Sequence, residues 1–188
     1  TFKWQGARIR ELAHTLTGEP VGMIVNTHYH LDHTHGNPAF EAGTRVISTA
    51  RTLLHLERTD ARYFSGEAAK LLPGETFDDE ELTLEVGTKT VRLVHPGRGH
   101  TDGDLVALFV EDEVLVTGDL YFNQLYPNID LEAGGSIADW PATLDNVLRL
   151  PFARVIPGHG EVSDRDGLVA FRTFVAELAD VFVNDAFG

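Results

Sequence analysis

The sequence predicts a layered domain of strands and helices, and three observations lead to this prediction. Short apolar runs bounded by glycine alternate with segments whose apolar residues recur at helical spacing. Helical segments come both before and after the strands, which is typical of a layered α/β or α+β domain. No repeat, low-complexity tract or linker interrupts the 188 residues, so we expect a single domain over residues 1–188.

The predicted elements of the first part of the chain follow one another closely. Residues 7–17 have apolar positions at helical spacing, and Gly18 can end that helix. Residues 21–25 and 44–48 are short apolar runs that predict buried strands. A second helix is predicted over residues 50–58.

The middle of the chain predicts two hairpins. Residues 82–86 and 90–94 flank a turn that begins with Gly87, and residues 105–110 and 114–117 flank an acidic turn. Each pair of runs is therefore expected to form a hairpin before the last helices.

The last part of the chain predicts a short strand between two helices. Asp139 can cap a helix that has Pro141 in its first turn and runs to about Leu150. Residues 154–156 form the strand, and Asp164 or Asp166 begins a helix that runs to about Val181.

Composition excludes several classes of protein. Apolar residues make up 43% of the chain, which fits a folded globular domain. No apolar stretch approaches the roughly 20 residues that a membrane span needs. The net charge of −14 opposes attraction to nucleic acid or anionic lipid, so we expect neither as a partner. There is no cysteine, so there is no disulfide or thiolate ligand, and the compartment stays unknown.

The segment from His28 to His33 carries the strongest functional signal. It reads His-Tyr-His-Leu-Asp-His and follows the predicted strand 21–25, so three imidazoles and one carboxylate lie within six residues. Imidazole and carboxylate are ligands of zinc, and iron and manganese accept them as well. Four ligands so close together cannot easily serve one ion, so the spacing indicates two neighbouring metals. The alternative is a polar loop that happens to be rich in histidine.

Three further candidate ligands follow predicted strands, each at a turn that contains glycine. His100 ends the segment Pro-Gly-Arg-Gly-His, Asp119 follows Gly118, and His159 lies in Pro-Gly-His-Gly. Glycine accepts backbone conformations that other residues resist, so each segment can turn sharply and present its ligand. We expect these strand ends to contribute ligands to one face of a rigid scaffold.

These four segments, in this order over about residues 21 to 160, closely resemble the metallo-β-lactamase superfamily. The resemblance implies an α+β fold, the four-layer αβ/βα metallo-β-lactamase sandwich, with a two-metal site at one edge. It also implies which residue holds which ion. The first metal is held by His28, His30 and His100, the second by Asp32, His33 and His159, and Asp119 bridges the two.

The implied chemistry is hydrolysis by a metal-bound hydroxide. Two divalent ions roughly 3.5–4 Å apart can share a hydroxide, and metal binding brings the pKa of water to about 7. Two Zn²⁺ per chain are expected, with Fe or Mn accepting the same ligands. Asp32 is the predicted catalytic residue, because it could accept a hydrogen bond from the hydroxide and orient it.

Asp119 narrows the predicted activity. True metallo-β-lactamases tend to have cysteine or serine at this position, whereas hydrolases of thioesters, lactones and phosphodiesters have the bridging aspartate. The chain thus resembles a hydrolase of an ester, lactone, thioester or amide carbonyl, with β-lactamase side activity and a small-molecule substrate. A glutathione thioester would need basic residues to hold its carboxylates, and only Arg165 and Arg172 follow the last ligand.

Two alternative functions stay open. One is a mononuclear iron enzyme similar to persulfide dioxygenases, whose ligand pattern overlaps this one. The other is a metal-binding fragment without competent catalysis. His30 excludes the flavodiiron type of the superfamily, which carries glutamate there.

Two more expectations concern the start of the chain and the loop after Asp119. The resemblance implies several strands before the first helix, so we expect an incomplete N-terminal half-sheet, whose exposed edge would favour a homo-oligomer. Tyr121, Phe122 and Tyr126 could line an apolar substrate pocket or could simply cover the core. Asp102 and Asp104 are predicted to be turn residues, or to contact a ligand residue, rather than to be ligands themselves.

Overall fold

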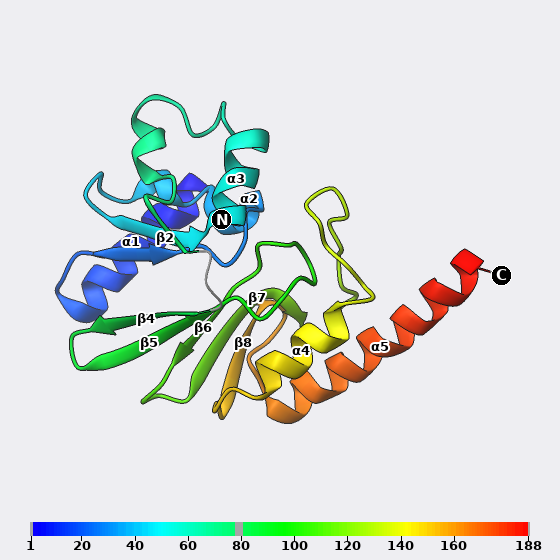
Figure 1. Cartoon of the computed structure of the whole chain (residues 1–188). Helices are drawn as coiled ribbons and strands as arrows, with labels where there is room; N and C mark the ends of the chain where they lie inside the picture. The colour runs from blue at the N-terminus through cyan, green and yellow to red at the C-terminus, as the bar shows by residue number, and fades with distance from the viewer. Residues whose placement is uncertain (1, 78–80, 188) are drawn as a thin grey trace. The chain divides into compact units, whose positions relative to one another are not determined.

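The chain folds as two compact units, an N-terminal unit of residues 1–78 and a C-terminal unit of residues 79–188 (Figure 1). The computed structural model describes residues 2–77 and 81–187, with residues 182–187 described by their backbone alone. Each unit has its own sheet and its own helices. The α+β class predicted from the sequence is confirmed, whereas a single domain over the whole chain stays a prediction.

The N-terminal unit is built on a three-stranded parallel sheet in the order β1-β2-β3. Its strands are β1 (Met23–Val25), β2 (Arg45–Thr49) and β3 (Glu75–Phe77). Its helices are α1 (Lys3–Thr17), α2 (Leu31–Thr34), α3 (Ala50–Thr59) and two 3₁₀ helices, η1 (Asn37–Ala39) and η2 (Gly66–Leu71). The expectation that strands are missing before α1 stays a prediction.

Local signals set the ends of the helices in this unit. Gly18 ends α1 as predicted, because it takes the left-handed conformation at φ 75° and donates its N–H to the carbonyl of His14. Thr49 ends β2 and caps α3, since its hydroxyl accepts the N–H of Thr52. The predicted strand 21–25 is confirmed as β1, which is shorter at its start.

The C-terminal unit is built on a six-stranded sheet in the order β4-β5-β6-β7-β8-β9. Its strands are β4 (Glu81–Val86), β5 (Lys89–Val94), β6 (Val106–Phe109), β7 (Val114–Phe122), β8 (Arg154–His159) and β9 (Ser163–Asp164). Its helices are α4 (Trp140–Leu148) and α5 (Arg165–Phe187). Strands β4 to β7 form an antiparallel meander, so both predicted hairpins are confirmed, and α4 lies in the connection between the parallel strands β7 and β8.

The core of the C-terminal unit lies between its sheet and the two helices, which run side by side along the sheet (Figure 1). Trp140 and Leu144 of α4 and Leu168 and Val175 of α5 are completely or almost completely buried. Burial of large apolar side chains stabilises by about 1.5–3 kcal/mol each, which fixes the helices against the strands that carry the site residues. None of the described helices combines the length and apolar content that crossing a membrane requires.

Two details of the C-terminal unit differ from the sequence prediction. Helix α4 begins where predicted, but Asp139 makes no side-chain cap, because its carboxylate accepts a hydrogen bond from Arg98 instead. Strand β7 does not end at Thr117 but continues to Phe122 with irregular pairing around Gly118. Asp119 therefore lies within an irregular strand rather than after one.

Candidate metal centre

The loop that follows β1 gathers four of the predicted ligands of the N-terminal unit. His28 is buried, and its ring lies 4.9 Å from that of His30 and 4.3 Å from that of His33, measured between centroids. Asp32 and His33 lie on α2, with 3.2 Å between Oδ2 of Asp32 and Nε2 of His33. Three imidazoles and one carboxylate thus form a first His/Asp cluster within this unit.

Buried amide contacts hold this loop in place. The side chains of Asn26 and Asn37 exchange two hydrogen bonds, at 2.8 and 3.3 Å, across the turn that carries the ligands. The amide of Asn37 also donates to the carbonyl of Leu71 in η2. Thr34 donates its hydroxyl to the carbonyls of Tyr29 and His30 at the start of α2. The cluster therefore rests on satisfied buried polar groups, which are costly to rearrange.

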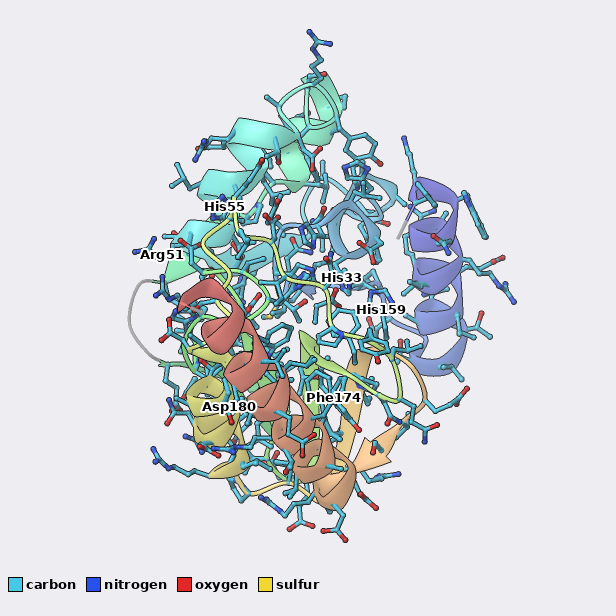
Figure 2. The ribbon with its side chains drawn as sticks, turned by 90° about the vertical axis from the view of Figure 1, so that its right-hand side faces the viewer. His33, Arg51, His55, His159, Phe174 and Asp180 are labelled. Atoms are coloured by element: carbon cyan, nitrogen blue, oxygen red, sulfur yellow. The ribbon has the colours of Figure 1, made fainter. Side chains whose placement is uncertain are left out.

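The C-terminal unit brings its three predicted ligands together around one carboxylate oxygen. Oδ2 of Asp119 lies 3.5 Å from Nε2 of His100 and 3.4 Å from Nε2 of His159. Asp119 and His100 are buried, whereas the His159 side chain is 40% exposed. Figure 2 labels His159 at the end of β8. These residues form a second His/Asp cluster.

The hydrogen bond on the far side of the His100 ring indicates which nitrogen faces Asp119. Nδ1 of His100 lies 2.7 Å from the carbonyl oxygen of Asn128, and because a carbonyl only accepts, Nδ1 donates its proton there. In the neutral ring the lone pair of Nε2 then faces the Asp119 carboxylate, so two acceptors meet. A cation between them would stabilise this arrangement. A metal-ligating histidine commonly donates its other N–H to a carbonyl in this way.

Within each unit, pairs of ligand atoms are close enough to serve one ion. His28 and His30 offer nitrogens within 4.8 Å of each other, as do the ligand atoms of Asp32 and His33 and those of His100 and Asp119. Nitrogen and carboxylate oxygen without sulfur form a donor set that suits Zn²⁺ and also iron or manganese. The residues present therefore fit divalent metal. The joining of the two clusters into one two-metal site stays a prediction.

Asp104 is a buried acidic group whose setting the sequence did not reveal. It lies in a turn as predicted but is only 2% exposed, and it accepts hydrogen bonds from the N–H and the hydroxyl of Thr101. Burial raises the pKa of Asp104 to about 7, although the bonds from Thr101 act in the opposite direction. Its hydrogen bonds hold the turn that follows His100. The spacing Thr-x-x-Asp, from Thr101 to Asp104, is the feature of the sequence that could have indicated this hydrogen-bonded turn.

Two other histidines near the first motif serve packing. The ring of His35 stacks on that of Tyr63, with centroids 3.7 Å apart, and its Nε2 lies 3.4 Å from Asp60. His55 is buried on α3 with its ring 5.1 Å from that of Tyr29. Both of these rings lie against the N-terminal unit's own aromatic residues.

The described architecture and ligand clusters match a known family. The model of the metallo-beta-lactamase superfamily matches residues 3–159, which is most of the chain and includes all seven predicted ligands. The chain belongs to the metallo-β-lactamase superfamily. The resemblance read from the sequence motifs is thereby confirmed.

Curated relatives of this superfamily member are named as β-lactamases and as a hydrolase. A metallo-beta-lactamase type 2 of Bacillus cereus is 26% identical over 145 residues, which cover 76% of this chain and 53% of that protein. A probable metallo-hydrolase of Methanocaldococcus jannaschii is 27% identical over 163 residues, covering 82% and 77%. The chain spans about half the length of the type 2 β-lactamases that it matches.

Solved structures of the superfamily share the fold. A metallo-beta-lactamase from Pontibacter korlensis superimposes with a TM-score of 0.76 and 22% identity over 90% of this chain and 75% of that one. The metallo-beta-lactamase DIM-1 gives the same TM-score and identity over 94% of this chain and 80% of its own. The predicted metallo-β-lactamase fold is confirmed by this likeness.

Proposed function

We propose that this chain is a metal-dependent hydrolase that acts on an ester, lactone, thioester or amide carbonyl. The observation that carries the proposal is the pair of imidazole nitrogens at 3.5 and 3.4 Å from one oxygen of Asp119 in a member of this superfamily. A carboxylate oxygen flanked by two histidine nitrogens suits a bridging ligand between two ions. Zn²⁺ is the proposed metal, at two per chain.

The ligand sets are proposed from the family pattern. His28, His30 and His100 would hold one ion, Asp32, His33 and His159 the other, and Asp119 would belong to both. Ligand atoms of His28 and His30 lie within 4.8 Å of each other, as do those of Asp32 and His33, which agrees with this division. So does the placement of both His100 and His159 against Asp119 in the C-terminal unit.

The residues of the site would hold the ions and orient the attacking water. The bound ions would lower the pKa of that water and polarise the substrate carbonyl. Asp32 is 45% exposed beside His33, so its carboxylate can both ligate and accept a hydrogen bond from an attacking water. The carbonyl of Asn128 fixes the ring orientation of His100. The buried contacts of Asn26 and Asn37 limit the movement of the first motif.

The charges in the chain favour a neutral small-molecule substrate. A net charge of −14 raises the cost of bringing a polyanion such as RNA to the site. Both arginines after the last ligand are engaged, Arg165 with backbone carbonyls and Arg172 with the carboxylate of Asp145. They are poorly placed to hold the carboxylates of glutathione. β-Lactam hydrolysis is proposed as a side activity, since related proteins carry that name.

Metal analysis combined with a substrate panel tests this function. The purified chain is loaded with zinc or iron, its metal content is measured, and kcat/KM is compared for a lactone, a thioester, a β-lactam and RNA at equal salt. Two zinc ions per chain with turnover of a carbonyl substrate is the expected result. One iron per chain would support the dioxygenase alternative, and bound metal without any turnover would support a non-catalytic fragment. Faster cleavage of RNA than of every carbonyl substrate would contradict the charge argument.

A further inference from the structure

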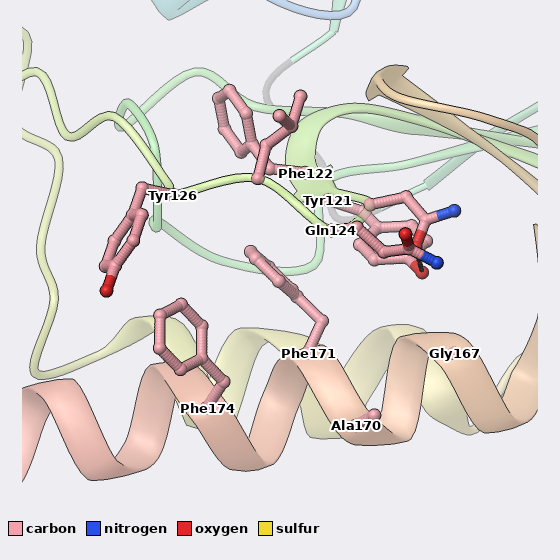
Figure 3. A pocket seen from close by; sticks show the side chains of 10 residues that line it. Tyr121, Phe122, Gln124, Tyr126, Gly167, Ala170, Phe171 and Phe174 are labelled. Atoms are coloured by element: carbon pink, nitrogen blue, oxygen red, sulfur yellow. Dashed lines mark hydrogen bonds between the residues drawn. The ribbon is translucent and has the colours of Figure 1, made fainter.

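The C-terminal unit contains an apolar pocket beside its ligand cluster. The pocket has a volume of roughly 550 Å³ and lies between residues 121–126 and one face of α5 (Figure 3). Helix α5 contributes Gly167, Ala170, Phe171 and Phe174, which recur at the spacing of a single helix face. The seven steps from Gly167 to Phe174, at a rise of 1.5 Å each, give this face a length of about 10 Å. The pocket therefore extends along about 10 Å of the helix.

The lining is neutral and largely aromatic. No acidic, basic or histidine side chain belongs to the residues found to line it. The rings of Tyr126 and Phe174 meet edge to face with centroids 5.5 Å apart, and the ring of Phe171 projects from α5 into the space (Figure 3). The amide of Asn123 is already engaged with Tyr121 and with the carbonyl of Glu161. A charged ligand would find nothing in this lining to pair with, whereas an apolar one would be well matched.

Phe122 connects this pocket with the metal ligands. It lines the pocket, and its ring stacks on that of His159 with centroids 5.3 Å apart and an angle of 12° between the planes. The ring of Phe122 also lies 5.9 Å from that of His100. Asp119 lies three residues earlier on the same strand. The ring of Phe122 thus contacts both the pocket and two of the predicted ligands.

The backbone and the exposed apolar residues at the pocket rim support a binding role. Gln124 has a φ of 59°, a left-handed conformation that residues other than glycine seldom adopt, and such positions often occur at functional sites. Leu125 and Tyr126 are 51% and 80% exposed, so large apolar groups face solvent at the entrance. A ligand that covered them would gain the free energy of removing this surface from water.

We infer that this pocket binds the unbranched acyl chain of the substrate. The inference rests on the proposed hydrolase function, and it specifies that the substrate is a neutral acyl ester, lactone or thioester with an aliphatic tail. The scissile carbonyl lies at the ligand cluster, and the tail passes Phe122 and follows α5 toward Phe174. An apolar pocket that extends along α5 beside a candidate cation site is suited to such a two-part molecule.

Binding of simple alcohols tests the pocket without any hydrolysis. The full chain is titrated calorimetrically with primary alcohols from 1-butanol to 1-decanol, which carry an aliphatic chain but no carbonyl. Affinity should rise by up to about fourfold for each added methylene, because burial of one CH₂ group is worth about 0.8 kcal/mol. Affinity that does not depend on chain length would overturn the inference.

Two tryptophan substitutions on α5 locate the binding site. Ala170 lines the pocket, whereas its neighbour Val169 does not and is 44% exposed. Ala170→Trp should lower the affinity for 1-decanol at least tenfold and leave 1-butanol within about twofold, whereas Val169→Trp should change neither. The melting temperature of each variant reports folding, and Ala170→Leu provides a smaller filling group. Equal losses in the Ala170 and Val169 variants would overturn the proposed location.

A substrate series connects the pocket to turnover. With the metal-loaded protein, kcat/KM for acyl thioesters should rise with acyl length in the natural chain and in Val169→Trp, and should become flat in Ala170→Trp. Turnover that ignores acyl length while the alcohols still bind would overturn the role of the pocket in substrate binding. Absence of all turnover would instead contradict the proposed function, and the alcohol titrations would still decide whether the pocket binds aliphatic chains.

Discussion

Gly158 packs directly against the carboxylate of Asp119, and position 158 has no space for a side chain. A Cβ added at Gly158 would overlap Oδ1 of Asp119 and would lie 2.7 Å from the carbonyl carbon of Gly118. Gly158 belongs to β8 and Asp119 to the neighbouring strand β7, which is irregular at this point. The glycine in Pro-Gly-His-Gly thus serves close packing of two strands, beyond the turn that the sequence suggests.

We therefore predict that Gly158→Ala weakens metal binding through displacement of Asp119. The affinity for zinc should fall by roughly 10–100-fold, the usual effect of disturbing a residue that positions a metal ligand. Competition with a chromophoric chelator measures it. Gly43→Ala is the matched control, because a Cβ at Gly43 meets nothing within 4 Å. Equal zinc affinities in the two variants would show that Asp119 does not need its present position.

Asp32→Asn should affect turnover more than it affects the ion held by His28, His30 and His100. Asp32 and His33 lie side by side on α2, and asparagine keeps the shape of the side chain but removes its charge. We expect kcat to fall by at least about 100-fold, the lower range for loss of a group that assists proton transfer. Metal content and kcat are measured on the same samples. Loss of both ions in parallel with kcat would contradict a separate orienting role.

Removal of metal should lower the thermal stability of the chain. The proposed ligands come from several distant segments, so bound metal stabilises only the folded arrangement. Metal at a free concentration of 100 times its Kd adds about 2.7 kcal/mol, and for a chain of this size this corresponds to a shift in Tm of roughly 5–10 °C. Calorimetry with and without chelator measures the shift. An unchanged Tm would mean that the scaffold does not depend on its ligands being occupied.

Features of the site and the fold that depend on neighbouring residues could be predicted from the sequence. The ligand segments were predictable because each places its ligands within a few residues of an apolar run, and three of the four include a glycine before the ligand, so the signal is local. Strand β3 was missed because it is short and pairs with β2 across a long separation, with Ile47 opposite Glu75. The continuation of β7 to Phe122 was missed because its partner, His159 at the end of β8, is distant in the chain. These features depend on non-local pairing, which composition does not encode.

The missing helix cap at Asp139 has a different cause, which is competition between two partners for its carboxylate. Asp139 has the residue type of a helix cap, but Arg98 lies near enough to take its carboxylate, and an ion pair with a charge-assisted hydrogen bond prevails. The hydrogen bond with Arg98 also keeps the pKa of Asp139 below its ordinary value. Arg98 precedes Asp139 by 41 residues. A cap predicted from a window of a few residues cannot include such a partner.

Arg165 should be required for the stability of the C-terminal unit. Its guanidinium donates to the carbonyls of Leu148, Leu150 and Phe152, at the end of α4 and just after it, and it lies 4.3 Å from the centroid of the Phe152 ring. Lysine cannot reproduce this fork of donors. Arg165→Lys should lower the free energy of unfolding by about 2 kcal/mol, as expected for loss of charge-assisted hydrogen bonds to partly buried carbonyls.

Urea denaturation of the metal-free chain measures this loss. Arg149→Lys is the control, because Arg149 is exposed and donates to the single side chain of Asn146. That variant should change the free energy of unfolding by less than about 0.5 kcal/mol. Equal effects of the two lysine variants would show that the three carbonyls are satisfied by water when Arg165 is absent.

Asp104 should make the stability of the metal-free chain fall as pH rises. Burial raises the pKa of this carboxyl from 3.8 to about 7, so between these values the folded chain binds a proton at Asp104 that the unfolded chain has released. Folding then takes up a proton, and the contribution of this group is present below about pH 4 and lost as pH rises through 7. A difference of about three pKa units corresponds to at most about 4 kcal/mol. In Asp104→Asn the side chain cannot ionise, yet it can still accept the N–H of Thr101 and donate to its hydroxyl.

Urea denaturation in chelator at about pH 5 and about pH 8 measures this dependence. Between these two pH values, the natural chain should lose more stability than the Asp104→Asn variant. Parallel losses in the two proteins would mean that the buried carboxyl ionises at its ordinary pKa.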